Sequence, residues 1–196
     1  MAAGRLPLVP VSYTHLLLKE TDIALSVSMT TRNPRQGEID GISYYFVTEE
    51  AFLKNIAEDG FLEYAQVYGN YYGTPKEPVL RQLAAGTDVI LEIDMQGALR
   101  VKENFPDGVF LFILPPSMAE LRKRLTGRGT ENSEAIEMRL GETLKELSYI
   151  DKYDYCVVNG KLEEAVARVK AIITAEHSKV TFTAEELISK YKEEEV

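Results

Sequence analysis

The stretch that decides the fold is residues 88–97, with the sequence DVILEIDMQG. Its first six residues are largely apolar and rich in β-branched side chains, which is typical of a short strand buried in a parallel sheet. Two carboxylates, Glu92 and Asp94, stand at the carboxyl end of this strand, where open α/β sheets bind their ligands. Because a carboxylate in such a place is costly unless it binds something, we expect a ligand there.

A second segment of the same kind lies downstream, at residues 109–114. Two prolines end it, and Ser117 with Glu120 forms a capping box that begins a helix. From Ile23 onward, strand-like and helix-like segments alternate along the chain. This alternation predicts an α/β layered domain with a largely parallel sheet.

The composition is that of an ordinary globular protein of one compact domain, with 196 residues, 45% hydrophobic and 27% charged. The net charge of −9 argues against nucleic-acid binding through a basic surface. No apolar run approaches the roughly 20 residues that span a bilayer. Cys156 is the only cysteine, so an internal disulfide is excluded, and with two histidines a zinc site is not expected. We expect a cytoplasmic protein that binds neither nucleic acid nor membranes.

The first candidate site is a loop that follows the first predicted strand. Arg32 and Arg35 stand three residues apart around Pro34. Two guanidinium groups on one loop can direct charge-assisted hydrogen bonds at a single phosphate. Taken alone, the same loop is also compatible with a solvated turn.

The second candidate site is residues 62–75, which are rich in acidic, aromatic and hydroxyl side chains. Glu63 offers acceptors for the donor edge of guanine, and Tyr72 offers a ring or a hydroxyl. The neighbouring tyrosines also fit amphipathic positions at the edge of the core. We expect residues 70–73 to turn the chain and Thr74 with the following proline to begin a helix.

The third candidate site is basic, in an otherwise acidic chain. Lys123, Arg124 and Arg128 surround a glycine-flanked loop, and Arg139 follows on the next predicted helix. Such arginines suit a mobile lid that offsets the charge developing in phosphoryl transfer. The alternative is a basic helix paired with nearby glutamates.

Together and in this order, these segments closely resemble the guanylate kinase family over residues 23–179. The matching motifs are SMTTRNPRQGEIDGISYYF, EYAQVYGNYYGTP, LEIDMQGA, FILPPS, RLTGRGTE and YDYCVVN. The resemblance implies an α/β, P-loop kinase-like parallel sheet flanked by helices, with a GMP-binding α+β insertion and a lid. It also implies an enzyme, an ATP:GMP phosphotransferase, which transfers the γ-phosphate of Mg²⁺-ATP to GMP and yields ADP and GDP.

The resemblance further implies a role for each residue that matches a family motif. The ligands of the GMP phosphate are Arg32, Arg35, Tyr44 and Tyr72. The guanine-side contacts are Ser28, Glu63, Thr74 and Asp94. The arginines at the ATP phosphates are Arg124, Arg128 and Arg139. Glu92 matches a position near the phosphates or their metal, and Asn159 one near the adenine.

One family motif is missing from the sequence. The loop G-x-x-x-x-G-K-[ST], whose backbone amides and lysine cradle phosphates, occurs nowhere in the chain. Gly160 and Lys161 form the only Gly-Lys pair, without the other residues of the motif. We therefore expect the first strand and the P-loop to be absent and ATP turnover to be severely reduced. Residues 6–13 could fill the strand position only partly, because Pro7 and Pro10 lack ladder donors.

The expected organisation has three parts. Residues 1–22 form an atypical leader, for which a foreign origin is one interpretation. Residues 23–179 form the guanylate-kinase-like domain, with the GMP-binding region near residues 32–86 and the lid near residues 124–140. Residues 180–196 form a polar C-terminal tail.

Two other functions stay open at this point. The missing loop favours a non-catalytic guanylate-kinase-like module that binds peptides, whereas the complete set of GMP-side residues opposes it. A kinase of another nucleotide is the second alternative, since the preference for guanine depends on one carboxylate and two hydroxyls. The expected partners are GMP and ATP, with Mg²⁺ as cofactor, and the sequence does not determine the oligomeric state.

Overall fold

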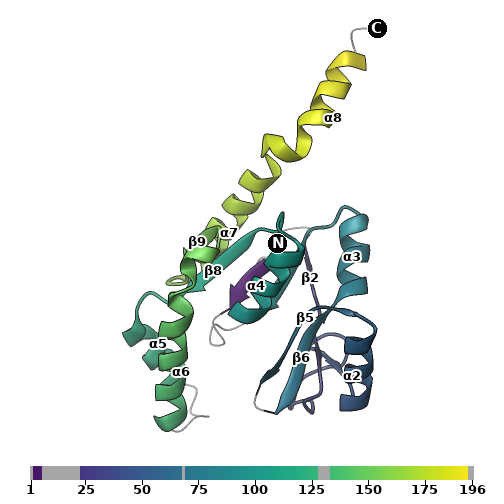
Figure 1. Cartoon of the computed structure of the whole chain (residues 1–196). Helices are drawn as coiled ribbons and strands as arrows, with labels where there is room; N and C mark the ends of the chain where they lie inside the picture. The colour runs from purple at the N-terminus through teal and green to yellow at the C-terminus, as the bar shows by residue number, and fades with distance from the viewer. Residues whose placement is uncertain (1, 6–22, 68, 128–132, 194–196) are drawn as a thin grey trace.

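A five-stranded sheet forms the centre of the computed structural model, which describes residues 2–5, 23–67, 69–127 and 133–193 (Figure 1). Its strand order is β2-β7-β1-β8-β9, and each neighbouring pair is parallel. The strands are β1 (Ala2–Arg5), β2 (Ala24–Leu25), β7 (Val89–Ile93), β8 (Phe110–Leu114) and β9 (Tyr155–Val158). The predicted α/β domain with a parallel sheet is confirmed.

The expectation that the first strand is absent is wrong. β1 (Ala2–Arg5) occupies the central position between β7 and β8, with Gly4 level with Ile93 on one side and Phe112 on the other. These four residues precede both prolines, so each can donate a ladder hydrogen bond, and the gap between β7 and β8 leaves backbone groups that need partners. Residues 6–22, which include the segment expected to fill the gap and the position of a loop after β1, lie outside the described residues.

Helices cover both faces of this sheet. The helices are α2 (Glu49–Ala57), α3 (Lys76–Ala84), α4 (Met95–Asn104), α5 (Met118–Thr126), α6 (Ser133–Leu147), α7 (Leu162–His177) and α8 (Val180–Glu193), with a short 3₁₀ turn at Ile150–Lys152. Side chains along β7 alternate between the faces: Ile90 packs in the core beneath α7, whereas Leu91 and Ile93 pack in the core beneath α4. The strand is therefore buried on both sides, as its continuous apolar character predicted.

A second sheet, of four strands in the order β4-β3-β6-β5, flanks the first. Its strands are β3 (Met29–Thr30), β4 (Tyr45–Phe46), β5 (Phe61–Val67) and β6 (Asn70–Pro75). In Figure 1 this sheet lies on one side of α4, while α5 and α6 lie on the other side. The expected GMP-binding insertion thus has the predicted mixture of strands and helices.

Two local predictions in this insertion are wrong. Residues 70–73 do not turn the chain but form part of β6, which pairs with β5 as an antiparallel hairpin. The turn comes earlier, at Gly69, whose φ of +78° suits a residue without a Cβ. Thr74 does not cap α3, because it belongs to the strand and its hydroxyl is used elsewhere; Pro75 occupies the cap position without a side-chain hydrogen bond.

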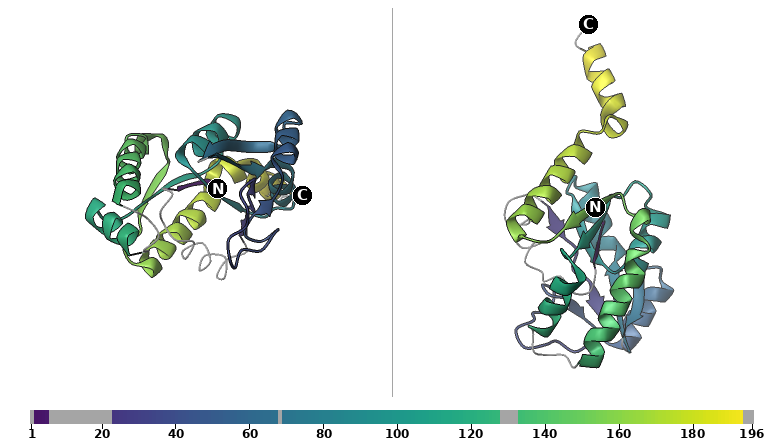
Figure 2. Two further views of the ribbon diagram at one scale, coloured as in Figure 1. Left: turned by 90° about the horizontal axis from the view of Figure 1, so that it is seen from below. Right: turned by 90° about the vertical axis from the view of Figure 1, so that its left-hand side faces the viewer.

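The remaining elements form two outer parts. α5 and α6 pack against each other through Leu121, Leu125, Ile136 and Leu140. α7 continues into α8, which extends away from the body of the molecule in Figure 1 and in the right-hand view of Figure 2. Within the described part of the chain, no helix is both long enough and apolar enough to cross a membrane.

Candidate active site

The structure brings three predicted guanine-side residues together beside the N-terminus of α4. The Thr74 hydroxyl donates to Glu63 Oε1 at 2.6 Å, and both side chains are buried. Asp94 follows β7 and caps α4, since its Oδ1 accepts from the Gly97 amide at 2.7 Å. The β5–β6 hairpin and the end of β7 thus bring together three side chains from two separate stretches of sequence, and their role as a guanine site stays a prediction.

The Glu63 carboxyl is held in a poorly solvated place. Burial, with a smaller contribution from the neighbouring charge of Asp94, raises the pKa of Glu63 to about 6, although the hydrogen bond from Thr74 opposes this shift. A buried acceptor that is only partly compensated gains from a ligand that supplies donors. The electrostatics therefore favour a ligand with N–H groups at this point.

Gly97 belongs to the LEIDMQGA motif and lies against two of the predicted site residues, but it was not among the predictions. A Cβ at this position would lie 2.8 Å from Glu63 Oε2 and 3.3 Å from Asp94 Oδ1. The glycine lets α4 approach both carboxylates, even though glycine in a helix costs about 1 kcal/mol relative to alanine. The only sign of this role in the sequence is that glycine, which disfavours helices, stands in the first turn of a predicted helix.

A second group brings together three predicted phosphate ligands, one from β6 and two from the segments next to β3 and β4. The Arg32 guanidinium lies 5.5 Å from the centre of the Tyr44 ring, and the Tyr44 and Tyr72 rings meet edge to face at 6.1 Å. Arg32 and Tyr44 also contact Phe46. Aromatic faces thus hold one guanidinium between β3, β4 and β6.

Glu38 organises this second group and was not predicted. Its Oε1 accepts from the Arg32 guanidinium at 2.9 Å, and its Oε2 accepts from the Arg35 backbone amide at 2.7 Å. The hydrogen bond from Arg32 is the main cause that lowers the pKa of Glu38 and raises the pKa of Arg32. The Glu38 carboxylate thus already accepts a hydrogen bond from the Arg32 guanidinium, which the prediction assigns to the GMP phosphate.

Ser28 has a backbone role on this side of the insertion, because its carbonyl accepts from the Tyr45 amide at 2.9 Å. Its side chain is half-buried. No hydrogen bond of its hydroxyl supports or opposes the predicted guanine contact among the interactions described. The guanine role of Ser28 stays a prediction.

On the opposite flank, Arg124 and Asn159 are direct neighbours. Arg124 Nη1 donates to the Asn159 carbonyl at 3.1 Å, Nη2 donates to the Gly160 carbonyl at 3.4 Å, and Nε pairs with Glu120 at 3.0 Å. The arginine therefore joins α5 to the turn before α7. Arg139 is half-buried on α6, whereas Arg128 lies outside the described residues.

A further acidic group connects α6 to the carboxyl end of β7. Burial first, then the charges of Asp94 and Glu142, raises the pKa of Glu146 to about 7. Burial, followed by Glu146 and Asp94, also raises the pKa of Tyr153, whose hydroxyl oxygen is buried without a hydrogen-bond partner among the described atoms. Sequence reasoning missed Glu146 because it stands in a helix with several other glutamates.

The described residues contain no group of three or more His, Cys, Asp or Glu side chains that could hold a metal ion by themselves. Mg²⁺ is commonly bound by one or two carboxylates together with phosphate oxygens. Glu92, half-buried near the carboxyl end of β7, is a carboxylate of the required type.

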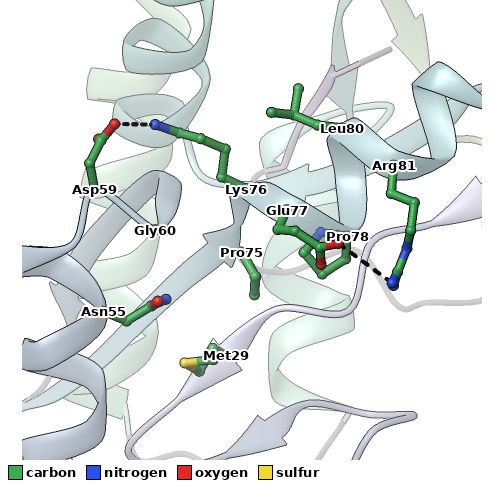
Figure 3. Close-up of a pocket in the computed structure, with 10 residues that line it drawn as sticks. All are labelled: Met29, Asn55, Asp59, Gly60, Pro75, Lys76, Glu77, Pro78, Leu80 and Arg81. Atoms are coloured by element: carbon green, nitrogen blue, oxygen red, sulfur yellow. Dashed lines mark hydrogen bonds and ion pairs between the residues drawn. The ribbon is translucent and has the colours of Figure 1, made fainter.

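A cavity of about 570 Å³ lies apart from these groups, where β3, the end of α2 and the start of α3 meet (Figure 3). Met29, Pro75 and Pro78 contribute apolar surface to it. The cations at its rim are paired, Lys76 with Asp59 at 2.5 Å and Arg81 with Glu77 at 3.5 Å. No predicted site residue lines this cavity, so it is not the predicted nucleotide site.

Comparisons with known proteins agree with the fold and with the motifs. A family model described as guanylate kinase matches residues 14–176. A guanylate kinase of Clostridium perfringens is 54% identical over 179 residues, which cover 91% of this chain and 83% of that protein. One of Caldanaerobacter subterraneus is 54% identical over 92% of this chain and 87% of the relative. The crystal structure of guanylate kinase from Anaplasma phagocytophilum superposes with a TM-score of 0.74 at 36% identity, covering 91% of this chain and 85% of its own. The chain therefore belongs to the guanylate kinase family.

Proposed function

We propose that this chain binds GMP and transfers to it the γ-phosphate of ATP, giving GDP and ADP, at a reduced rate. The observation that carries the proposal is the buried hydrogen bond from Thr74 to Glu63, placed beside Asp94 at the carboxyl end of a parallel strand. A site that presents buried acceptors at a strand end suits a ligand with a donor edge. Guanine, with N1–H and an exocyclic amine on one edge, is such a ligand.

Recognition of the GMP phosphate falls to the group around Arg32. When the phosphate arrives, it replaces Glu38 as the acceptor of the Arg32 guanidinium, and a doubly charged phosphate is a stronger acceptor than one carboxylate. Arg35, Tyr44 and Tyr72 add donors at the same place. Glu38 keeps the arginine extended and oriented before binding, which reduces the entropy lost when the phosphate binds.

In the reaction, a phosphate oxygen of GMP forms a bond to the γ-phosphorus of ATP while the bond from that phosphorus to the bridging oxygen of ADP breaks. The protein forms no covalent intermediate and contributes position and charge. Arg124, Arg128 and Arg139 would offset the charge on the transferred group, and Asn159 would lie near the adenine. Glu92 is the residue that would help to hold Mg²⁺ with the nucleotide phosphates, and the ion would supply further charge neutralisation.

The reduced rate follows from the sequence, which contains no G-x-x-x-x-G-K-[ST] motif. The single Gly-Lys pair does not substitute for it: the Gly160 carbonyl accepts from Arg124 and Lys161 pairs with Glu164 at 3.0 Å, so this turn serves to begin α7. That motif normally supplies the backbone amides that hold the ATP phosphates, so its absence from the sequence supports a reduced rate. GMP binding does not depend on that loop.

The experiment that tests the proposal measures GMP binding and ATP turnover separately. Calorimetric titration with GMP, with AMP as the comparison nucleotide, measures the acceptor site, and a coupled assay with Mg²⁺-ATP measures turnover. We expect GMP to bind and AMP to bind far more weakly, with slow formation of GDP. Equal affinities for the two nucleotides, or no affinity for either, would contradict the acceptor site; rapid turnover would contradict the impairment alone.

A non-catalytic binding module is the second candidate, favoured by the missing motif. It predicts no turnover under any condition and binding of a peptide in place of GMP. A phosphopeptide that binds the chain and is not displaced by GMP would support this function over the first.

A further inference from the structure

Arg100 lies on α4, three residues after Gly97 and beyond the LEIDMQGA motif, so the family motifs give it no role. Residues three apart on a helix share one face, and Gly97 is the point at which α4 approaches Glu63. Arg100 is therefore on the face of α4 that meets strand β5.

The Arg100 side chain contacts one residue of β5 in two ways. Its Nη1 donates to the backbone carbonyl of Tyr64, and its guanidinium carbon lies 5.8 Å from the centre of the Tyr64 ring. β5 is an edge strand, because the order of its sheet is β4-β3-β6-β5, so its outward carbonyls need donors from outside the sheet. Arg100 supplies such a donor and fastens β5 to α4.

Tyr64 directly follows Glu63, the predicted acceptor for guanine. The Glu63 carboxyl is already restricted on two sides, since Thr74 donates to its Oε1 and Gly97 lies against its Oε2. The contact with Arg100 restricts the strand at the next residue. Three separate contacts thus fix where the carboxyl stands relative to α4.

The charge of Arg100 also acts on the Glu63 carboxyl. Burial is the main cause that raises the pKa of Glu63 and Asp94 adds to the rise, whereas hydrogen bonds from Thr74 and the charge of Arg100 lower this pKa. These groups come from β6, from the end of β7 and from α4. An ionised carboxylate offers acceptors to both N–H groups of guanine, whereas a protonated carboxyl turns one oxygen into a donor. A positive charge at this place favours the form that accepts from guanine.

We infer that Arg100 is a positioning residue of the acceptor site, which clasps β5 to α4 and thereby holds the Glu63 carboxylate in place as the acceptor for guanine. Arg100 acts through Glu63 and is assigned no contact with the nucleotide. The guanine part of this role rests on the proposed function, whereas the effect of Arg100 on Glu63 belongs to the nucleotide-free protein.

The first measurement is the titration of the Glu63 carboxyl by carbon-13 NMR in the full chain without nucleotide, with Glu63→Gln used to assign the resonance by its loss. We expect a midpoint of about 6 in the unaltered chain. Arg100→Met removes the charge and the donors but keeps an unbranched apolar side chain, so its midpoint is expected to be higher by about 0.5 pH unit. Arg100→Lys restores a charge and a donor, and its midpoint is expected close to that of the unaltered chain.

Arg81→Met is the matched control, since it removes an exposed arginine of α3 that pairs with Glu77 at 3.5 Å. It is expected to leave the Glu63 midpoint unchanged. If Arg100→Met does not raise the midpoint, Arg100 does not position Glu63 and the inference is overturned. It is equally overturned if Arg81→Met raises the midpoint as much, because net charge alone then accounts for the shift.

The second measurement is calorimetric titration with GMP at pH 5.5 and at pH 7.5. A midpoint higher by about 0.5 pH unit lowers the ionised fraction of Glu63 about threefold at pH 5.5 and hardly at all at pH 7.5. We therefore expect Arg100→Met to bind GMP about threefold more weakly at the lower pH only, and Arg100→Lys to recover this loss.

An arginine that merely attracts the GMP phosphate would give the opposite pH dependence, because a phosphate gains its second charge above a pH of about 6. A loss of affinity that is larger at pH 7.5 than at pH 5.5 would therefore overturn the positioning role. Absence of GMP binding by the unaltered chain would contradict the proposed function instead, and the NMR titration would still decide whether Arg100 positions Glu63.

Discussion

The two flanks of the predicted site differ in how far they are built before any ligand binds. On the GMP side, Glu63 and Thr74 are buried and joined by a short hydrogen bond, and Gly97 lets α4 approach them. On the ATP side, Arg124 is partly exposed and occupied by a carboxylate and two carbonyls. The predicted acceptor site is thus preorganised by the core, whereas on the predicted donor side Arg124 would have to exchange its present partners for phosphates. Specificity for the base is expected to reside in the rigid flank.

The largest expected effect tests that rigid flank directly. Glu63→Gln keeps an oxygen that accepts from Thr74 but replaces the second acceptor with a donor, which opposes the donor edge of guanine. A side chain whose hydrogen-bonding groups match the edge of a base contributes about 1–3 kcal/mol of binding free energy, so we expect GMP affinity to fall roughly 100-fold. Calorimetric titration with GMP measures this without depending on ATP turnover.

The control for this change is Glu58→Gln, which alters an exposed carboxyl 3.8 Å from Lys54 on α2. Its GMP affinity is expected to equal that of the unaltered chain. If the two variants bind GMP equally well, Glu63 is not the guanine acceptor.

The second effect is the pH dependence of stability. The unfolded chain holds the Glu63 proton with a pKa of 4.5, and burial raises the folded pKa to about 6. The folded state therefore binds this proton more tightly, so the contribution to stability is complete below pH 4.5 and is lost as the pH rises through about 6. The loss amounts to about 2 kcal/mol, from 1.36 kcal/mol per pKa unit.

Urea unfolding of the unaltered chain and of Glu63→Gln, at a series of pH values between 4.5 and 7, measures the difference. The variant is expected to lose less stability over this window. Glu146→Gln serves as the comparison, because Glu146 retains its proton to about pH 7 and its effect should extend higher in pH. If the unfolding free energy of all three proteins changes with pH in the same way, burial does not raise the pKa of these carboxyl groups.

The third effect concerns the close approach of α4. Gly97→Ala improves helix propensity by up to about 1 kcal/mol, yet its methyl group meets Glu63 Oε2 at 2.8 Å. We expect GMP affinity to fall about tenfold as the carboxylate is displaced. Gly141→Ala, on α6, is the control, because its added Cβ meets nothing within 4 Å. That substitution should raise the unfolding free energy by up to about 1 kcal/mol and leave GMP affinity unchanged.

The smallest effect compares two arginines of α5. Arg124→Ala removes hydrogen bonds to the Asn159 and Gly160 carbonyls and an ion pair with Glu120, and it should cost about 1 kcal/mol of stability. Arg122→Ala removes only an exposed pair with Glu137, which is worth little in water. Thermal unfolding of both variants measures the difference. Equal melting temperatures would mean that the contacts of Arg124 do not stabilise the turn before α7.

Most of the fold could be predicted from local signals. Thr48, Asp94 and Ser117 each accept from a backbone amide at the start of a helix, and the buried strands β7 and β8 begin and end within one residue of the predicted bounds. Such signals are short-range, because a cap or an apolar run acts on its own backbone. The predicted turn at residues 70–73 was wrong, because pairing with β5 overrode the turn-like composition of these residues.

The sequence by itself determined the α/β class, the guanylate kinase family and the residue types of the site, because side-chain chemistry and motif order are properties of the chain alone. Only the tertiary structure decided that Ala2–Arg5 enters the sheet between β7 and β8, that Glu38 holds Arg32, and that Gly97 admits α4 to Glu63. Each of these depends on which segments meet in space. Contacts between residues far apart in the chain leave no local pattern, so they become visible only when packing joins the two partners.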